Sequence, residues 1–98
     1  MSNGIPETFQ LSQNYPNPFN PTTTIRYSLP RDAFVTLKVY NILGQEVVTL
    51  KDEFQNIGTF NTTWSGRNNA GSQVASGMYL YQLTAGSRTE VKKLLLLK

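Results

Sequence analysis

Apolar and polar residues alternate along several short stretches of the chain, with the period of two that is typical of β-strands. In the clearest stretch, Val35, Leu37 and Val39 share one face, and Thr36 and Lys38 fall on the other. Clusters of Gly, Pro, Asn and Asp separate these stretches, and no stretch shows a helical period. The predicted strands are 9–11, 24–29, 34–40, 46–50, 59–64, 78–84 and 88–98.

Seven short strands without a helix predict an all-β fold, a seven-stranded antiparallel immunoglobulin-like β-sandwich. The turn at 41–44 joins one predicted hairpin, and the turn at 85–87 joins the last one. The chain has no cysteine, so it cannot have the disulfide of antibody domains, and any kinship with them is architectural. A seven-stranded, partly open barrel is the alternative fold.

The stretch 14–21 holds three prolines and three asparagines in eight residues. Proline fixes φ and has no backbone N–H, so this stretch cannot be a helix or a central strand. We expect an ordered, mostly extended loop that closes one end of the sandwich, with Tyr15 and Phe19 as its hydrophobic anchors. Its structural motif consists of Tyr15, Pro16, Asn17, Pro18 and Phe19.

The last predicted strand departs from simple alternation, because its final residues are apolar on both faces. Leu95 and Leu97 fall on one face, and Leu94 and Leu96 fall on the other. Such a strand is either a central strand covered on both sides or an exposed apolar ridge. Exposed ridges and free edges are where partners bind, so an edge-strand dimer is one outcome; the sequence leaves the oligomeric state open.

The composition argues against catalysis. The 98 residues allow one domain with a single core, and they include neither cysteine nor histidine. Asp52 and Glu53 are the only adjacent carboxylates, and neighbours on an extended segment point to opposite sides, so we expect both to be solvated in a turn. Hydrolytic triads usually need a histidine base. We therefore expect no enzymatic activity and no cofactor.

Other binding functions are also disfavoured. The loop 65–71 supplies amide and backbone oxygens without a carboxylate, which favours a tight turn over a calcium site. The net charge is +3 and the nine basic residues are dispersed, whereas a nucleic-acid-binding protein usually clusters them. No stretch approaches the ~20 apolar residues of a membrane span. We therefore expect no nucleic-acid partner and no membrane insertion.

Tyrosines on the predicted strands allow one further alternative, a carbohydrate-binding surface built from Tyr40, Tyr79 and Tyr81. However, Tyr79, Tyr81 and Leu83 share one face by alternation, and this favours a core position over a sugar-stacking platform.

The N-terminus suggests that the chain is part of a longer protein. Residues 1–4 resemble an initiator methionine followed by residues left from cloning. Residues 1–6 lack the apolar run of a signal peptide. We divide the chain into an N-terminal tail or linker, 1–7, and a domain, 8–98.

Several segments in a fixed order resemble the type A C-terminal sorting domain of the type IX (Por) secretion system, and the related immunoglobulin-like domain of flagellar hook-capping proteins. They comprise 11–21, 24–30, 39–47, the Trp64-Ser65-Gly66 corner with Asn68 and Gly71, 74–79 and 92–98. The resemblance covers essentially everything after residue 5. One departure is Ser65, where the family often has Asp, which weakens a cation-binding or hydrogen-bonding role at that corner.

The resemblance implies a sorting signal at the C-terminus of a secreted protein. Family members direct an N-terminal passenger through an outer-membrane translocon, and a surface sortase then commonly removes them. The passenger is released or stays at the cell surface. Gly77 and Tyr79 would belong to the family's Gly-x-Tyr motif. The terminal signal would comprise Lys92, Lys93, Leu94, Leu95, Leu96, Leu97 and Lys98.

We expect the translocon to read the last strand, partly through main-chain pairing at its edge. The alternative is a structural or adhesion module of a secreted multidomain protein, with carbohydrate binding as a variant of it.

Overall fold

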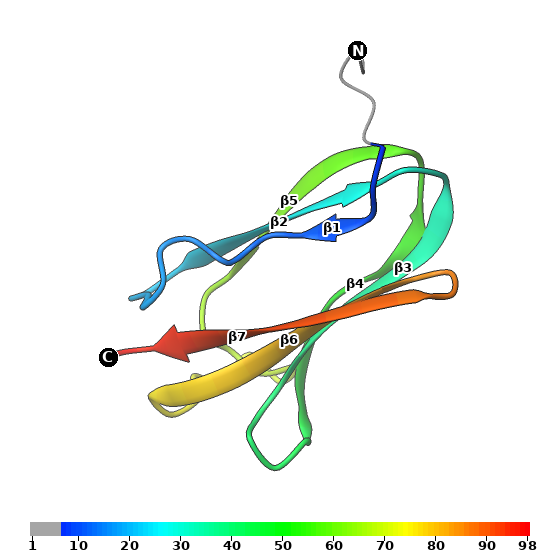
Figure 1. Ribbon diagram of the computed structural model, residues 1–98. Coiled ribbons are helices and arrows are strands. Elements are labelled where there is room, and N and C mark those ends of the chain that lie inside the picture. The colour runs from blue at the N-terminus through cyan, green and yellow to red at the C-terminus, as the bar shows by residue number, and fades with distance from the viewer. Residues whose placement is uncertain (1–6) are drawn as a thin grey trace.

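A computed structural model describes residues 7–98 of the chain. These residues form seven β-strands in two facing sheets (Figure 1). The strands are β1 (Gln10–Leu11), β2 (Thr23–Leu29), β3 (Ala33–Tyr40), β4 (Glu46–Gln55), β5 (Gly58–Trp64), β6 (Gly77–Ala85) and β7 (Arg88–Leu96). The predicted all-β sandwich is confirmed. Most of the predicted tail lies outside the described residues.

The strands divide into a three-stranded sheet of order β1-β2-β5 and a four-stranded sheet of order β4-β3-β6-β7. All of the strand pairs are antiparallel, and the larger sheet consists of the two predicted hairpins side by side. The chain passes between the sheets after β2, β4 and β5. Asp32 joins the first two of these crossings, since its Oδ1 accepts a hydrogen bond from the Ile57 N–H at 2.7 Å.

The predicted inward positions form the core. Ile25, Tyr27 and Leu29 of β2 are fully buried, and so are Val35, Leu37 and Val39 of β3. Each fully buried side chain of this size contributes about 1.5–3 kcal/mol relative to an exposed one. The core residues of β6 include Tyr79, Tyr81 and Leu83, which confirms their assignment to the core rather than to a sugar-binding surface.

Strand β4 is five residues longer than predicted, because β3 pairs with it from Ala33↔Gln55 to Tyr40↔Glu46 across two register irregularities. Asp52 and Glu53 therefore lie in a strand, where both are exposed, and the expected turn at this position is wrong. Main-chain pairing with β3 outweighs the polar side chains that favoured a turn.

Candidate partner-binding site at the C-terminal strand

Strand β7 lies at one edge of the four-stranded sheet and pairs only with β6 among the named strands. Leu94 and Leu96 point into the core and are buried. The alternate residues Val91, Lys93, Leu95 and Leu97 form what we call the outer row, which faces away from the core. Val91 and Leu97 are about half exposed. Of the two sequence-based alternatives, β7 is thus the strand with an exposed apolar ridge rather than a covered central strand.

The proline-rich loop, residues 13–21, covers the main-chain edge of β7 where the strand ends. The Phe19 N–H donates to Leu95 O at 3.0 Å, and the Leu97 N–H donates to Phe19 O at 3.1 Å. Asn17 Oδ1 accepts from the Leu95 N–H at 2.9 Å, and Gln13 Nε2 donates to Lys93 O at 2.7 Å. The N–H groups of Leu95 and Leu97 and the carbonyl groups of Lys93 and Leu95 are therefore already hydrogen-bonded within the domain.

A buried polar cluster anchors this loop to both sheets. The Asn14 N–H donates to the Tyr81 hydroxyl at 2.8 Å, and that hydroxyl donates to Ser12 O at 2.7 Å. Asn14 Nδ2 donates to Thr23 Oγ1 at 2.9 Å, and Thr23 Oγ1 donates to Pro16 O at 2.8 Å. Burial raises the pKa of Tyr81 to about 12, so its hydroxyl keeps its proton and serves as donor and acceptor.

Only one of the two predicted hydrophobic anchors of the loop is correct. Phe19 is 1% exposed and its ring centroid lies 5.6 Å from that of Trp64. Tyr15 is 80% exposed, so the expectation for its side chain is wrong. Asn14 takes the inward position, and consecutive residues of an extended segment point to opposite sides. The main chain of Tyr15 still contributes, because it pairs with Thr24 through two hydrogen bonds of 2.9 Å.

The predicted corner at Trp64 and Gly66 packs against the end of β7. The Trp64 indole N–H donates to Arg67 O at 2.8 Å. Gly66 has φ of 74°, and a Cβ at this position would lie 3.3 Å from Leu96 Cδ2. This glycine therefore provides both a left-handed turn and space for the leucine.

The Gly-x-Tyr motif serves the start of β6. Gly77 has φ of 149° and no atom within 4 Å of a built Cβ, so its backbone conformation, rather than close packing, requires glycine. The Tyr79 ring packs edge-on against Trp64 at 5.5 Å, and its hydroxyl donates to Ala75 O at 2.6 Å. Tyr79 is buried, as are Leu94 and Leu96, whereas Lys93, Leu97 and Lys98 are exposed and Lys92 is half-buried. Leu95 is half-buried.

Sequence reasoning missed two residues that extend the outer row. Met78 is opposite Leu95 and Leu80 is opposite Lys93 in the β6–β7 pairing. Alternation with the buried Tyr79 already placed these two apolar residues on the outer face, which was the available signal. Among residues 7–98 the one ion pair is Lys38–Glu46, so the lysines of β7 have no carboxylate partner there.

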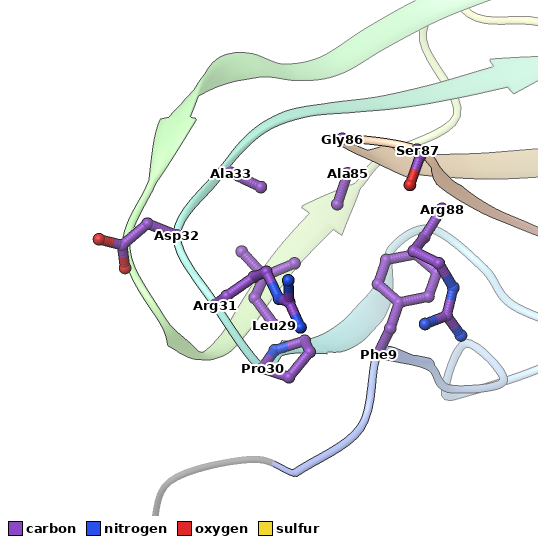
Figure 2. A pocket seen from close by; sticks show the side chains of 10 residues that line it. All are labelled: Phe9, Leu29, Pro30, Arg31, Asp32, Ala33, Ala85, Gly86, Ser87 and Arg88. Atoms are coloured by element: carbon purple, nitrogen blue, oxygen red, sulfur yellow. The ribbon is translucent and has the colours of Figure 1, made fainter.

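A cavity of about 490 Å³ lies at the opposite end of the sandwich (Figure 2). It is lined by Arg31 and Asp32 of the β2–β3 turn and by Arg88 at the start of β7. The Arg88 guanidinium lies over the Phe9 ring, 5.3 Å from its centroid. The Asp32 carboxylate already accepts the Ile57 N–H. In the described part of the chain, no group of three His, Cys, Asp or Glu residues is placed to hold a metal ion. No helix there is long and apolar enough to cross a membrane.

The fold and the site define the class: an immunoglobulin-like sandwich that presents the end of its last strand. The family model described as "Secretion system C-terminal sorting domain" (Por_Secre_tail) matches residues 13–97, and the chain belongs to this family. It is accordingly a sorting domain of the type IX (Por) secretion system, whose passenger is secreted or displayed at the cell surface. The match includes the proline-rich loop and all but the last residue of the terminal segment.

Several solved structures have a similar fold. Latent PorU from Porphyromonas gingivalis, a dimer, is 17% identical with a TM-score of 0.74; the match covers 99% of this chain and 10% of PorU. PorZ, an essential surface component of the type-IX secretion system of the same bacterium, is 17% identical with a TM-score of 0.61; the match covers 99% of this chain and 12% of PorZ.

FlgD from P. aeruginosa is 21% identical over 76% of this chain and 58% of FlgD, with a TM-score of 0.60. By contrast, the chain spans only about a tenth of the length of PorU. A search of curated protein sequences finds no match.

Proposed function

We propose that the domain is non-catalytic and that the secretion machinery recognises the outer row of β7 and the exposed Lys98 that follows it. The partners are the outer-membrane translocon, which recognises this surface, and a surface sortase, which separates the domain from its passenger. Residues 8–98 act as the sorting domain, and the tail 1–7 links them to the passenger.

The observation that carries this proposal is the combination of apolar and cationic side chains on the outer face. Leu95 and Leu97 leave apolar area exposed next to Met78. The exposed Lys93 lies in the same row without a carboxylate partner in the described residues, and the exposed Lys98 follows Leu97. Apolar surface rimmed by charge is typical of protein interfaces, and such a surface fits a partner with an apolar centre and an acidic rim.

Side-chain recognition fits the geometry better than main-chain pairing at the end of β7. Phe19 and Asn17 occupy the backbone groups of Leu95 and Leu97. A partner strand at this position would have to displace the proline-rich loop and its buried Asn14 cluster. The outer row is accessible without any such change.

The buried members of the terminal signal then have a positioning role. Leu94 and Leu96 fix the strand against the core, so that Leu95 is held on the opposite face. Tyr79 and Gly77 build the start of β6, with which this part of β7 pairs. Substituting these residues would therefore impair sorting indirectly, by disordering the surface that is recognised.

The test is an export assay in a bacterium with this secretion system. A fluorescent reporter with a periplasmic signal peptide precedes the domain, which carries either Leu95→Asp with Leu97→Asp or no change. The matched control is Phe34→Asp, a half-exposed phenylalanine on the same sheet face at the far end of β3. Thermal unfolding of each purified domain checks the fold.

We expect the unchanged domain and the Phe34→Asp variant to export the reporter. The paired leucine variant should remain in the periplasm while its domain stays folded. Normal export of a folded leucine variant would overturn the proposed surface. Periplasmic retention of every fusion, including the unchanged one, would instead favour the structural-module alternative.

The same geometry bears on self-association. An edge-to-edge dimer through the end of β7 requires the proline-rich loop to leave Leu95 and Leu97. We therefore propose that the isolated domain is monomeric and that a β7 dimer forms only when this loop is displaced. Light scattering of the isolated domain over a range of concentrations measures its mass.

A further inference from the structure

The turn between β3 and β4 exposes two large aliphatic side chains next to each other. Ile42 is 75% exposed and Leu43 is 78% exposed. Single exposed apolar residues are ordinary on protein surfaces, and turns favour Gly, Asn, Asp, Ser and Pro. An adjacent apolar pair at the end of a hairpin, the hairpin tip, therefore calls for a function beyond folding.

Hydrogen bonds that converge on Asn41 fix the shape of this tip. Asn41 Oδ1 accepts from the N–H groups of Leu43 and Gln45 at 2.9 and 3.0 Å, and its Nδ2 donates to Gln45 Oε1 at 2.8 Å. The main chain adds Gly44 N–H to Asn41 O and Asn41 N–H to Gln45 O, both at 3.0 Å. A tip that is already ordered loses little conformational entropy when it binds.

A second asparagine braces the base of the hairpin from the side. The Asn69 N–H donates to Val47 O and its Oδ1 accepts from the Thr49 N–H, both at 3.0 Å. Asn69 Nδ2 donates to Glu46 Oε2 at 3.1 Å. The loop between β5 and β6 thus covers the free edge of β4 just behind the tip and holds the hairpin in one direction.

The charges around the tip favour a protein over a lipid surface as its partner. Membrane-binding surfaces combine apolar residues with cations that attract anionic headgroups. The cation nearest the tip on β3, Lys38, is neutralised by Glu46 at 3.2 Å. The polar neighbours Asn41 and Gln45 bond to each other. Two aliphatic side chains with few free polar groups fit an apolar pocket in a protein.

We propose that Ile42 and Leu43 form a docking knob that inserts into an apolar pocket of the secretion machinery, with Asn41 and Asn69 as positioning residues. The tip lies at the same end of the sheet as the start of β6 and the end of β7 (Figure 1). It is a contact separate from the outer row. This inference rests on the proposed function, since it assigns the knob to the same machinery.

The test combines export with site-specific photocrosslinking in exporting cells. A photoreactive amino acid replaces Leu43 or, as the control, Phe54, which is exposed on the same sheet far from the tip. The adduct is identified by mass spectrometry. Export is measured for Ile42→Ser with Leu43→Ser and for Phe54→Ser, and thermal unfolding is measured for both purified domains.

We expect position 43 to crosslink to a protein of the secretion machinery, whereas position 54 does not. The paired serine variant should keep its melting temperature and lose export about tenfold, which corresponds to about 1.4 kcal/mol of contact energy. Unchanged export of the serine variant would overturn the knob. An adduct only with lipid, or only with a second copy of the domain, would overturn it as well.

The outcome is separable from that of the proposed function. Loss of export with the leucine variant of β7 but not with the serine variant of the tip would refute the knob alone. Loss of export with the tip variant but not with the leucine variant would support the knob. It would also refute the outer row of β7 as the main recognition surface.

Discussion

Each of the two edge strands of the four-stranded sheet has one main-chain edge that no neighbouring strand pairs with, and different side chains cover the two edges. An uncovered strand edge is a template for aggregation, and both β4 and β7 have part of their edge covered by a loop. At β7 the cover is Asn17 and Phe19, and at β4 it is Asn69. Neither cover is a strand of the sheet, so each edge is satisfied by a few specific hydrogen bonds.

The difference lies in what each strand contributes to the core. Strand β7 sends Leu94 and Leu96 inward, and the loop that covers it adds Phe19 to the same core. Strand β4 has one buried residue, Gln55, whose Oε1 accepts a hydrogen bond from the Tyr27 hydroxyl at 2.5 Å. The end of β7 is thus tied to the folding of the whole domain, whereas most of β4 is peripheral. The order of the terminal segment, residues 92–98, therefore depends on the folding of the domain.

The largest loss of stability is expected for Phe19→Ala. This change removes a buried ring that packs on Trp64 and weakens the loop that carries the two main-chain bonds to Leu95 and Leu97. We expect a loss of about 3–5 kcal/mol in the free energy of unfolding, as for other buried phenylalanines. Chemical denaturation measures it.

The control for this prediction is Phe54→Ala on the other edge strand. Phe54 is 62% exposed, so its removal should change the stability by no more than about 0.5 kcal/mol. Equal effects of the two substitutions would mean that β4 and β7 are equally integrated in the core, contrary to the comparison above.

Alternation predicted which side chains of the regular strands face inward, because the period of two is a local property of an extended chain. It predicted the two faces of β7 and the core positions of Tyr79 and Tyr81. It did not predict the orientation of Tyr15, since the proline-rich loop has no periodic pattern and a buried Asn14 does not look like a core residue.

The sequence also contained no pattern that predicted which residues cover the edge of β7. The bond from Gln13 to Lys93 joins residues eighty positions apart, and nothing local at either residue indicates it. The same holds for the brace on β4, where Asn69 looked like part of a simple turn. Sequence patterns therefore located the terminal strand and its two apolar faces. Which face is exposed, and how the main chain is covered, required the tertiary structure.

An intermediate effect is expected for Tyr81→Phe, which tests how the loop is held on the sheet. The change removes a buried hydroxyl and leaves the Asn14 N–H and Ser12 O without this partner. We expect a loss of about 1–3 kcal/mol in the free energy of unfolding. Tyr40→Phe is the control, because Tyr40 is half-buried on the outer face, and its change should be close to neutral.

The same pair of variants has a pH signature. Burial raises the pKa of Tyr81 from 10.0 to about 12, so the folded state holds this proton more tightly than the unfolded state does. The resulting stabilisation is fully present below pH 10.0 and is lost as the pH rises through about 12. Denaturation midpoints of Tyr81→Phe should fall less steeply over this range than those of Tyr40→Phe. Parallel pH profiles would contradict the assignment.

The smallest effect is expected for Asn17→Ala, which removes the side-chain acceptor of the Leu95 N–H and leaves the Phe19 bonds in place. We expect a loss of about 0.5–1.5 kcal/mol in the free energy of unfolding. Because the change uncovers one donor on the edge, the hydrogen exchange of the Leu95 amide should accelerate by more than that of Leu97. The control is Asn20→Ala, an exposed asparagine of the same loop. Equal acceleration at both amides would show that Asn17 orders the loop as a whole, and no acceleration at either amide would place the protection of Leu95 in β7 itself.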